Sequence, residues 1–269
     1  EKGFSFRKVR LGFGEEKIKI LCGNIQEYIK RYGEDEFVLE SISTLKYYLE
    51  KNTEAKNVGS IERLFFQLVD GLKAKVFESQ KATIEIKKSD VDNVLSAIDF
   101  ESFLSTRHSY RYFSPDSIDK KTLNEAFRLA EYTPTACNRQ AQKVFVFEGK
   151  EKEEVANWQV GCKGFIEEFQ YLLLITVDQR AYFQSEINQM YVDGGLYAMN
   201  LLHCLHAVGV ATIPLTAGSF SGKKRELLKK YAINQYDTPI MFIAIGSRPE
   251  TANVNLSKRK AFENYVMWK

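Results

Sequence analysis

The 269-residue sequence has only four cysteines, five prolines and three histidines, and it has no long hydrophobic run. No two cysteines form a Cys-x-x-Cys pair, which argues against zinc fingers and thioredoxin-type redox motifs. The longest apolar runs, such as 171–177 and 240–245, have the length of a strand, whereas a membrane span needs about 20 apolar residues. No signal-peptide pattern stands at the start. We therefore expect a cytoplasmic protein with reduced thiols and no membrane contact.

The charge and composition are those of an ordinary globular protein. Hydrophobic residues make up 44% and charged residues 27%, which excludes a disordered tail, a collagen-like fibre and a disulfide-rich miniprotein. The net charge of +3, from 38 basic and 35 acidic residues, is too small to predict a nucleic-acid partner. At about 150 residues per domain, the chain is longer than one typical domain.

Hydrophobic periodicity divides the chain near residue 98. Residues 13–77 have helical spacing, interrupted at Gly33 and at 51–59, and Thr83–Lys87 is a possible short strand. Ser89 is the expected N-cap of a helix that ends at Ile98. After Phe100 the predicted helices are Asp119–Glu131, Gln184–Val208 and Gly222–Tyr231, and the predicted strands are Lys143–Phe147, Tyr171–Val177 and Pro239–Gly246. We predict an α+β fold, a small mixed sheet flanked by helices over 99–269, preceded by a mostly helical region over 1–98.

Several familiar motifs are missing. The stretch 218–223 has three residues between its glycines instead of the four of a phosphate loop, and Lys224 stands where Ser or Thr is needed. The sequence also lacks the dinucleotide-binding, zinc-protease and nucleophile-elbow patterns. His203 and His206 lie in an apolar helix without a carboxylate pattern, so a core or interface role is favoured over metal binding.

The segment Arg107-His108-Ser109-Tyr110-Arg111 is the most informative. It carries two guanidinium groups, an imidazole and a hydroxyl, which can bind phosphate oxygens. If the segment is helical, Arg107 and Arg111 share a face. A solvated basic turn remains the alternative.

Two further segments carry polar groups. The loop Pro134–Gln140 lies between a predicted helix and a strand, and Asn138 and Gln140 offer donors and acceptors that suit the edge of a heterocycle. Ser257-Lys258-Arg259 places a second basic pair in the C-terminal tail. Taken alone, the first segment is an ordinary loop and the second is only a charged tail.

In this order and spacing, the three segments resemble the FMN-dependent nitroreductase family, over about Phe100 to Lys269. Residues 107–111 fit the family's Arg-[Arg/His]-Ser-x-[Arg/Lys] segment. Pro134, Asn138 and Gln140 fit its Pro-Ser-x-x-Asn-x-Gln loop, with Thr135 in place of Ser. The long helix near 191–208 resembles the family's dimer helix, and 213–216 resembles the loop that contacts the flavin ring.

The resemblance implies an FMN-dependent oxidoreductase in which NAD(P)H reduces the flavin and a nitro compound or quinone then accepts the electrons. It implies a homodimer with FMN at the interface, and no residue is assigned as a protein nucleophile or general base. Arg107, Ser109 and Arg259 would hold the phosphate, Arg111 and Asn138 would approach the ribityl chain or pyrimidine edge, and Thr135, Pro214 and Leu215 would line the ring. The full expected cofactor set is Arg107, His108, Ser109, Arg111, Pro134, Thr135, Asn138, Gln140, Pro214, Leu215, Thr216, Lys258 and Arg259.

The sequence also departs from the family pattern. Ala141 and Gln142 replace the usual proline and aromatic residue, and 215–218 lacks the usual acidic-glycine pair. These positions shape the pocket, so a specialised flavin enzyme for a biosynthetic oxidation or dehalogenation is one alternative. The helical N-terminal region motivates another, a non-catalytic flavin-binding or scaffold protein. Residues 157–165 have no assigned role.

Overall fold

The computed structural model describes residues 2–5, 8–73, 85–217 and 224–269. The chain divides into two compact units, Glu1–Ile98 and Asp99–Lys269. The rejected phosphate-loop stretch 218–223 lies outside the described residues, as do Thr83 and Ile84 of the possible strand Thr83–Lys87, whose remaining residues 85–87 are not in a strand. None of the helices in the described ranges is long and apolar enough to cross a membrane.

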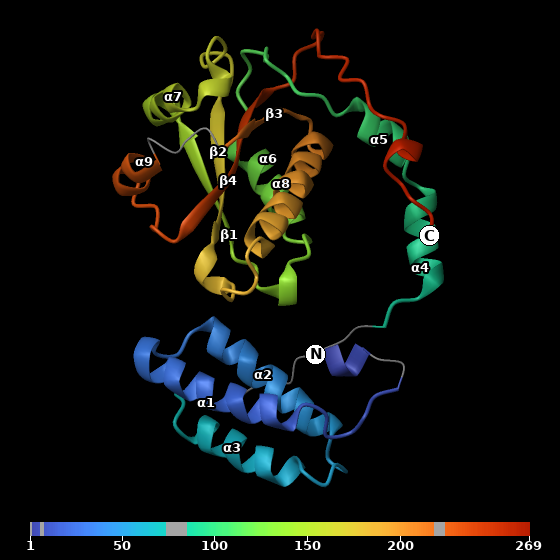
Figure 1. The fold of residues 1–269 in the computed structure, drawn as a ribbon, viewed down its shortest axis with the longest axis vertical. Coiled ribbons are helices and arrows are strands. Elements are labelled where there is room, and N and C mark those ends of the chain that lie inside the picture. Colours follow the sequence, from blue (N-terminus) through green and yellow to red (C-terminus); the bar gives the residue numbers. More distant parts are fainter. Residues whose placement is uncertain (1, 6–7, 74–84, 218–223) are drawn as a thin grey trace. The chain divides into compact units, whose positions relative to one another are not determined.

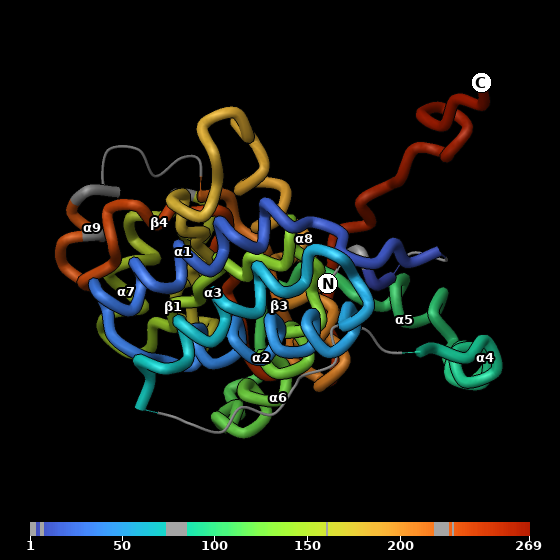
Figure 2. The backbone as a smooth tube through the Cα atoms, turned by 90° about the horizontal axis from the view of Figure 1, so that it is seen from below, coloured from blue at the N-terminus to red at the C-terminus, as the bar shows by residue number. Residues whose placement is uncertain are grey.

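The first unit is built on three amphipathic helices, α1 (Glu15–Tyr32), α2 (Glu36–Lys51) and α3 (Val58–Asp70), which lie side by side in Figures 1 and 2. Gly33 ends α1 with a φ of 84°, a conformation that favours glycine. Asp35 caps α2, because its carboxylate accepts a hydrogen bond from Val38 N at 3.0 Å. The core of this unit consists of Cys22, Ile25, Val38, Ile42, Leu45, Phe65, Leu68 and Leu72.

The helix α4 (Lys88–Ser96) buries none of its residues. The prediction that Ser89 caps it is wrong. The carbonyl of Lys87 accepts hydrogen bonds from Asp90 N and Val91 N, so the helix begins before Ser89 and Lys87 occupies the cap position. The Ser89 hydroxyl instead lies 3.3 Å from the Asp90 carboxylate.

The second unit contains a four-stranded sheet in the order β1-β2-β4-β3. The strands are β1 (Gln142–Glu148), β2 (Tyr171–Asp178), β3 (Val210–Thr216) and β4 (Asp237–Ser247). The α+β fold is confirmed. The three pairings of these strands are antiparallel, whereas a mixed sheet was expected, and a parallel bridge in the described part joins Ser109 to Thr212.

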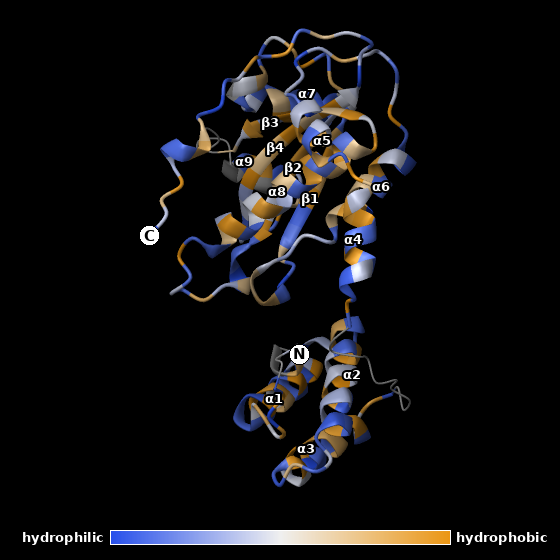
Figure 3. Cartoon of the chain, turned by 90° about the vertical axis from the view of Figure 1, so that its right-hand side faces the viewer, coloured by the Kyte–Doolittle hydropathy of each residue, from blue (hydrophilic) through white to orange (hydrophobic). Residues whose placement is uncertain are grey.

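Helices cover both faces of this sheet (Figure 1). One face packs against α6 (Lys120–Ala130) and α8 (Gln189–Ala207), and the other packs against α7 (Gly149–Trp158) and α9 (Lys224–Lys230). Apolar residues run along β2, β3 and β4 in Figure 3, as expected for strands covered on both faces. Gly194 lets α8 approach the sheet closely, because a Cβ there would lie 2.6 Å from Ile240 Cγ1.

Candidate functional site

The basic segment 107–111 leaves a helix and joins the sheet. The short helix α5 (Phe100–Thr106) is capped by Asp99, whose carboxylate accepts from Ser102 N at 3.1 Å. Arg107 is extended, with φ −77° and ψ 116°, and Tyr110 N then donates to Thr212 O of β3 at 3.0 Å. The segment is therefore not helical, and Arg107 and Arg111 do not share a helical face.

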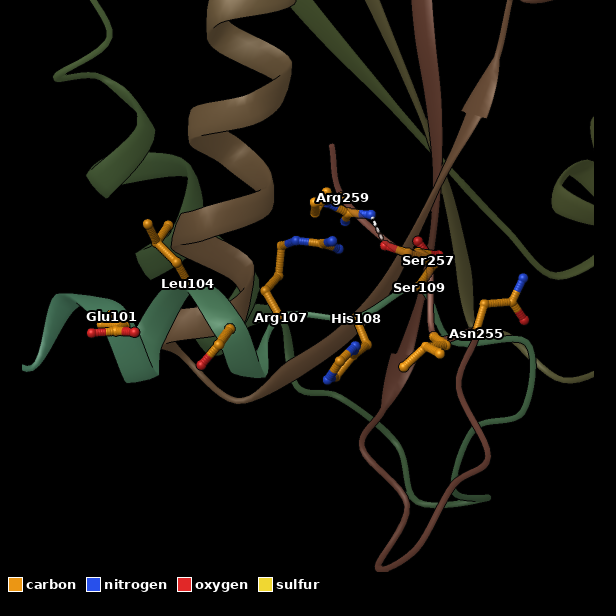
Figure 4. Close-up of a pocket in the computed structure, with 10 residues that line it drawn as sticks. Glu101, Leu104, Arg107, His108, Ser109, Asn255, Ser257 and Arg259 are labelled. Carbon is orange, nitrogen blue, oxygen red and sulfur yellow. Dashed lines mark hydrogen bonds between the residues drawn. The ribbon is translucent and has the colours of Figure 1, made fainter. Parts of the chain in front are cut away.

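A cavity of about 430 Å³ forms where this segment meets the C-terminal tail (Figure 4). Arg107, His108 and Ser109 line one side, and Asn255, Ser257 and Arg259 of the tail line the other. Figure 4 shows the guanidinium groups of Arg107 and Arg259 directed into the same space. The Arg259 guanidinium donates to the carbonyl of Ser257, whose φ is 45°. Two segments separated by about 150 residues thus converge on one basic cavity.

Arg107 is the electrostatic centre of this cavity. Its Nη1 atom is buried and has no hydrogen-bond partner among the residues that the structure describes. Burial, and then the positive charge of Arg259, lower the pKa of Arg107. Leaving a buried donor unpaired is unfavourable, and two neighbouring guanidinium groups repel each other. An anion with several oxygens, such as a phosphate, would relieve both effects because it accepts bidentate hydrogen bonds from arginine.

Two uncharged imidazoles lie beside Arg107, on the last turns of α8. Burial, and then the charge of Arg107, lower the pKa of His203 below its ordinary value of 6.5. In the described part of the chain, the buried His203 Nε2 has no hydrogen-bond partner. His206 Nδ1 faces the guanidinium of Arg248 at 3.1 Å, so this nitrogen accepts, and Nε2 lies 3.1 Å from Thr106 Oγ1. Phe103 of α5 packs against both rings. In the described ranges, no three His, Cys, Asp or Glu side chains are grouped to hold a metal ion.

The loop Pro134–Gln140 has an unusual backbone. Cys137, Asn138 and Gln140 all have a positive φ, between 49° and 55°, which costs about 1 kcal/mol or more for each non-glycine residue. Thr135 supports the turn from within, because its hydroxyl accepts from Gln140 N at 3.1 Å and its carbonyl accepts from Asn138 N at 3.0 Å.

Asp193 of α8 holds this loop in place by a hydrogen bond. It is 3% exposed, and its carboxylate accepts from Ala136 N at 3.0 Å, from Tyr182 Oη at 2.8 Å and from Gln189 Nε2 at 2.8 Å. Burial, and then the hydrogen bond to Asp193, raise the pKa of Tyr182, so the phenol of Tyr182 stays a donor. The loop is therefore held by a buried side chain that accepts hydrogen bonds from three donors.

The third expected contact region lies at the end of β3. Pro214 is half-buried, Leu215 is 8% exposed and Thr216 is exposed as the last residue of the strand. The sequence indicated a loop here, but 213–216 continues the strand to Thr216. A proline is tolerated in β3 because this strand lies at the edge of the sheet, where one row of backbone groups needs no partner strand.

Comparison with known proteins shows the fold of the second unit. Residues 104–162 match the model of the nitroreductase family. The second unit has the nitroreductase fold. Among solved structures, the chain is similar to a protein named an NAD(P)H:FMN oxidoreductase from Staphylococcus epidermidis, with a TM-score of 0.55 and 20% identity over 64% of this chain and 96% of that one. A protein named a nitroreductase from Desulfovibrio desulfuricans, in complex with FMN, gives 0.55 and 16% over 64% and 98%.

A nitroreductase-like protein from Streptococcus mutans gives a TM-score of 0.54 and 19% identity over 64% of this chain and 98% of that one. A search of curated proteins gave no significant match. The resemblance to the nitroreductase family is thus confirmed by the family model and by the fold.

Within this nitroreductase fold, the expected cofactor residues fall into separate groups. Arg107, His108, Ser109 and Arg259 line the basic cavity. Arg111 instead lies near the tail, with its Nη1 3.4 Å from Asn255 Oδ1, and the exposed Lys258 does not line the cavity. The loop 134–140 and the end of β3 do not line it either.

The helix α8 gives the distance between the loop 134–140 and the basic cavity within one chain. Asp193 contacts the loop 134–140, and His206 contacts Thr106 next to Arg107. These two helical residues are 13 positions apart, so they are separated by about 20 Å at 1.5 Å per residue. One chain therefore brings the basic groups together but leaves the loop at the other end of α8.

Sequence reasoning missed two contributors to this arrangement. Asn255 lines the cavity and contacts Arg111, but a single asparagine in a coil-like tail carries no recognisable pattern. Asp193 lies inside the predicted long helix. The signal that marks it is a carboxylate residue in an otherwise apolar helix, at a position that is 3% exposed.

Proposed function

We propose that this protein is an FMN-dependent oxidoreductase. The observation that supports this most directly is the half-buried Arg107, whose Nη1 atom is buried and has no partner among the described residues, and which faces Arg259 across a basic cavity. This donor set fits the phosphate of FMN. Arg107, Ser109 and Arg259 would bind the phosphate oxygens, because a charge-assisted hydrogen bond from guanidinium is strong and directional.

The remaining residues would act on the other parts of the cofactor. The loop held by Asp193 would present Thr135, Asn138 and Gln140 to the ribityl chain or the pyrimidine edge of the flavin. Pro214, Leu215 and Thr216 would lie along the ring. FMN, when bound, supplies the chemistry by accepting hydride from a nicotinamide donor and passing electrons to an acceptor. The positive charges of this chain would stabilise the negative charge that this chemistry creates.

A second copy of the chain would complete the site. The loop 134–140 and the basic cavity lie about 20 Å apart along α8. Val192, Leu196 and Met199 follow one another at helical spacing on α8 and are 51%, 47% and 43% exposed. Such a stripe is typical of a covered helix face. We propose that α8 pairs with a second α8, so that each cofactor is bound by the basic cavity of one copy and the loop of the other.

We propose NADH or NADPH as the donor and a small nitro compound or quinone as the acceptor. The names of the similar proteins point to both NAD(P)H and FMN. All four cysteines are free thiols, which suits the reducing cytoplasm that we also propose.

Steady-state kinetics test this function. Under anaerobic conditions, the FMN-loaded protein should turn over NADH or NADPH repeatedly only when a quinone or nitroaromatic acceptor is present, and Arg107→Met should lose this activity at limiting FMN. A protein that binds FMN but oxidises neither donor with any acceptor would argue for a specialised flavin enzyme. A protein that takes up no FMN would argue for a scaffold role.

A further inference from the structure

The segment that follows α7 contains a completely buried glutamine, Gln159. Its backbone N–H ends α7 by donating to Val155 O at 3.2 Å and to Ala156 O at 3.1 Å. Its side chain reaches away from the helix. Nε2 donates to Thr216 O at 3.0 Å, and Oε1 accepts from Gly161 N at 2.6 Å. Gln159 thus links the end of α7 to the last residue of β3.

The orientation of this carboxamide is fixed by its neighbours. Gly161 N can only donate, so Oε1 must face it, and the Nε2 donor is then left for the carbonyl of Thr216. A side chain at position 161 would crowd this arrangement, because a Cβ there would lie 3.1 Å from Oε1 and 3.2 Å from Nε2. Glycine at 161 therefore allows the close approach that the bridge needs.

The backbone around Gln159 is held as well. Cys162 Sγ donates to Ala156 O at 3.1 Å and to Gln159 O at 3.3 Å. Burial raises the pKa of this thiol, so it stays protonated and remains a donor near neutral pH. Hydrogen bonds therefore fix both the side chain and the backbone of Gln159 beside the end of β3.

The hydrogen bond from Gln159 is one of the contacts that hold the end of β3. The partner strand of β3 in the described part of the chain is β4, Ser109 forms a bridge with Thr212 earlier in β3, and Pro214 lacks an N–H. Gln159 supplies a donor to Thr216, and the next residue, Ala217, is 8% exposed. The bridge therefore holds the strand end at which Leu215 and Thr216 are expected to meet the flavin ring.

We propose that Gln159 is a positioning residue that sets where the end of β3 stands against the flavin ring. This inference rests on the proposed function, because the ring contact is part of that function. It gives a role to the segment 157–165, which the sequence motifs leave unexplained. Gln159 itself would not touch the cofactor.

The test compares Gln159→Glu with a matched variant, Gln170→Glu. Gln170 also bridges backbone groups, since Oε1 accepts from Ile118 N at 2.6 Å and Nε2 donates to Ile118 O at 3.3 Å. Both of these contacts are to Ile118 and not to the end of β3, and Gln170 does not line the basic cavity. The readouts are the Kd for FMN, the absorption spectrum of bound FMN, kcat and KM separately, the melting temperature, and hydrogen exchange of 213–217 in the cofactor-free protein.

At pH 8 a glutamate at 159 is ionised and cannot donate to Thr216 O. We expect faster exchange at 213–217, a Kd for FMN raised about three- to tenfold, and a shifted flavin spectrum. At pH 5.5 a buried carboxyl is protonated and can donate again, so the variant should return toward wild type, while the Cys162 thiol stays protonated at both pH values. Gln170→Glu should lower the melting temperature and leave the spectrum and Kd unchanged.

The outcomes separate this inference from the proposed function. A wild-type protein that binds FMN, with a Gln159→Glu variant of unchanged spectrum, Kd and kcat at pH 8, overturns the positioning role and leaves the function standing. A wild-type protein that binds no FMN overturns the function together with the flavin part of this inference. If Gln159→Glu does not fold, Gln159→Met, which keeps the volume without the donor, takes its place under the same criteria.

Discussion

Replacing Arg107 by methionine should weaken ligand binding without destabilising the cofactor-free protein. The side chain keeps a similar length but loses the guanidinium. Because a charge-assisted hydrogen bond to phosphate contributes about 1.5–3 kcal/mol, the affinity for FMN should fall about 10- to 150-fold. In the cofactor-free protein, the same change removes a buried, unpaired donor and its repulsion with Arg259. The free energy of unfolding should therefore stay constant or rise, by up to about 1 kcal/mol.

Two measurements decide this prediction. Quenching of flavin fluorescence at fixed ionic strength gives the Kd for FMN, and urea denaturation of the cofactor-free protein gives the free energy of unfolding. Arg128→Met is the control, because Arg128 forms an exposed ion pair with Glu125 outside the cavity and should leave the Kd unchanged. The reasoning about the cavity is refuted if Arg107→Met destabilises the cofactor-free protein and leaves the affinity for FMN intact.

Three other changes test neighbouring parts of the account. Asp193→Ala leaves three donors without their acceptor, so the free energy of unfolding in urea should fall by about 3 kcal/mol, and a loss under 1 kcal/mol would contradict the anchor role. The lowered pKa of His203 means that the unfolded chain binds a proton more readily, so stability should decrease as the pH falls below about 6.5 toward the folded pKa. In His203→Gln the melting temperature should depend less on pH between pH 7.5 and 5.5 than it does in the wild type. A melting temperature with the same pH dependence in both proteins would contradict this. Leu196→Glu should convert a dimer to a monomer in analytical ultracentrifugation, and a wild-type chain that is already monomeric at micromolar concentration would refute the α8 interface.

Most elements of the second unit could be read from sequence because their signals are local. The strand predicted at Tyr171–Val177 is β2, Tyr171–Asp178, and the helix predicted at Asp119–Glu131 is α6, Lys120–Ala130, with Asp119 as its cap. The long helix was predicted from Gln184, but α8 begins at Gln189. Before it, the Glu186 carboxylate accepts from Phe183 N and pairs with Arg139, which holds 183–186 outside the helix.

The parts that could not be predicted depend on contacts between distant residues. Strand β3 contains Pro214, which argues against a strand until the edge position of β3 is known. The pairing of Arg107 with Arg259 needs the tail to return to α5, and no local pattern encodes that. The two hydrogen bonds of Gln159 likewise become visible only when the end of β3 is placed beside α7.

The most direct test of the central claim is the flavin content of the purified protein after incubation with FMN and removal of the excess. We predict a yellow protein with the absorption spectrum of bound flavin and close to one FMN per chain, and an Arg107→Met variant with much less. A colourless wild-type protein that takes up no FMN would contradict the claim that the basic cavity is a flavin phosphate site.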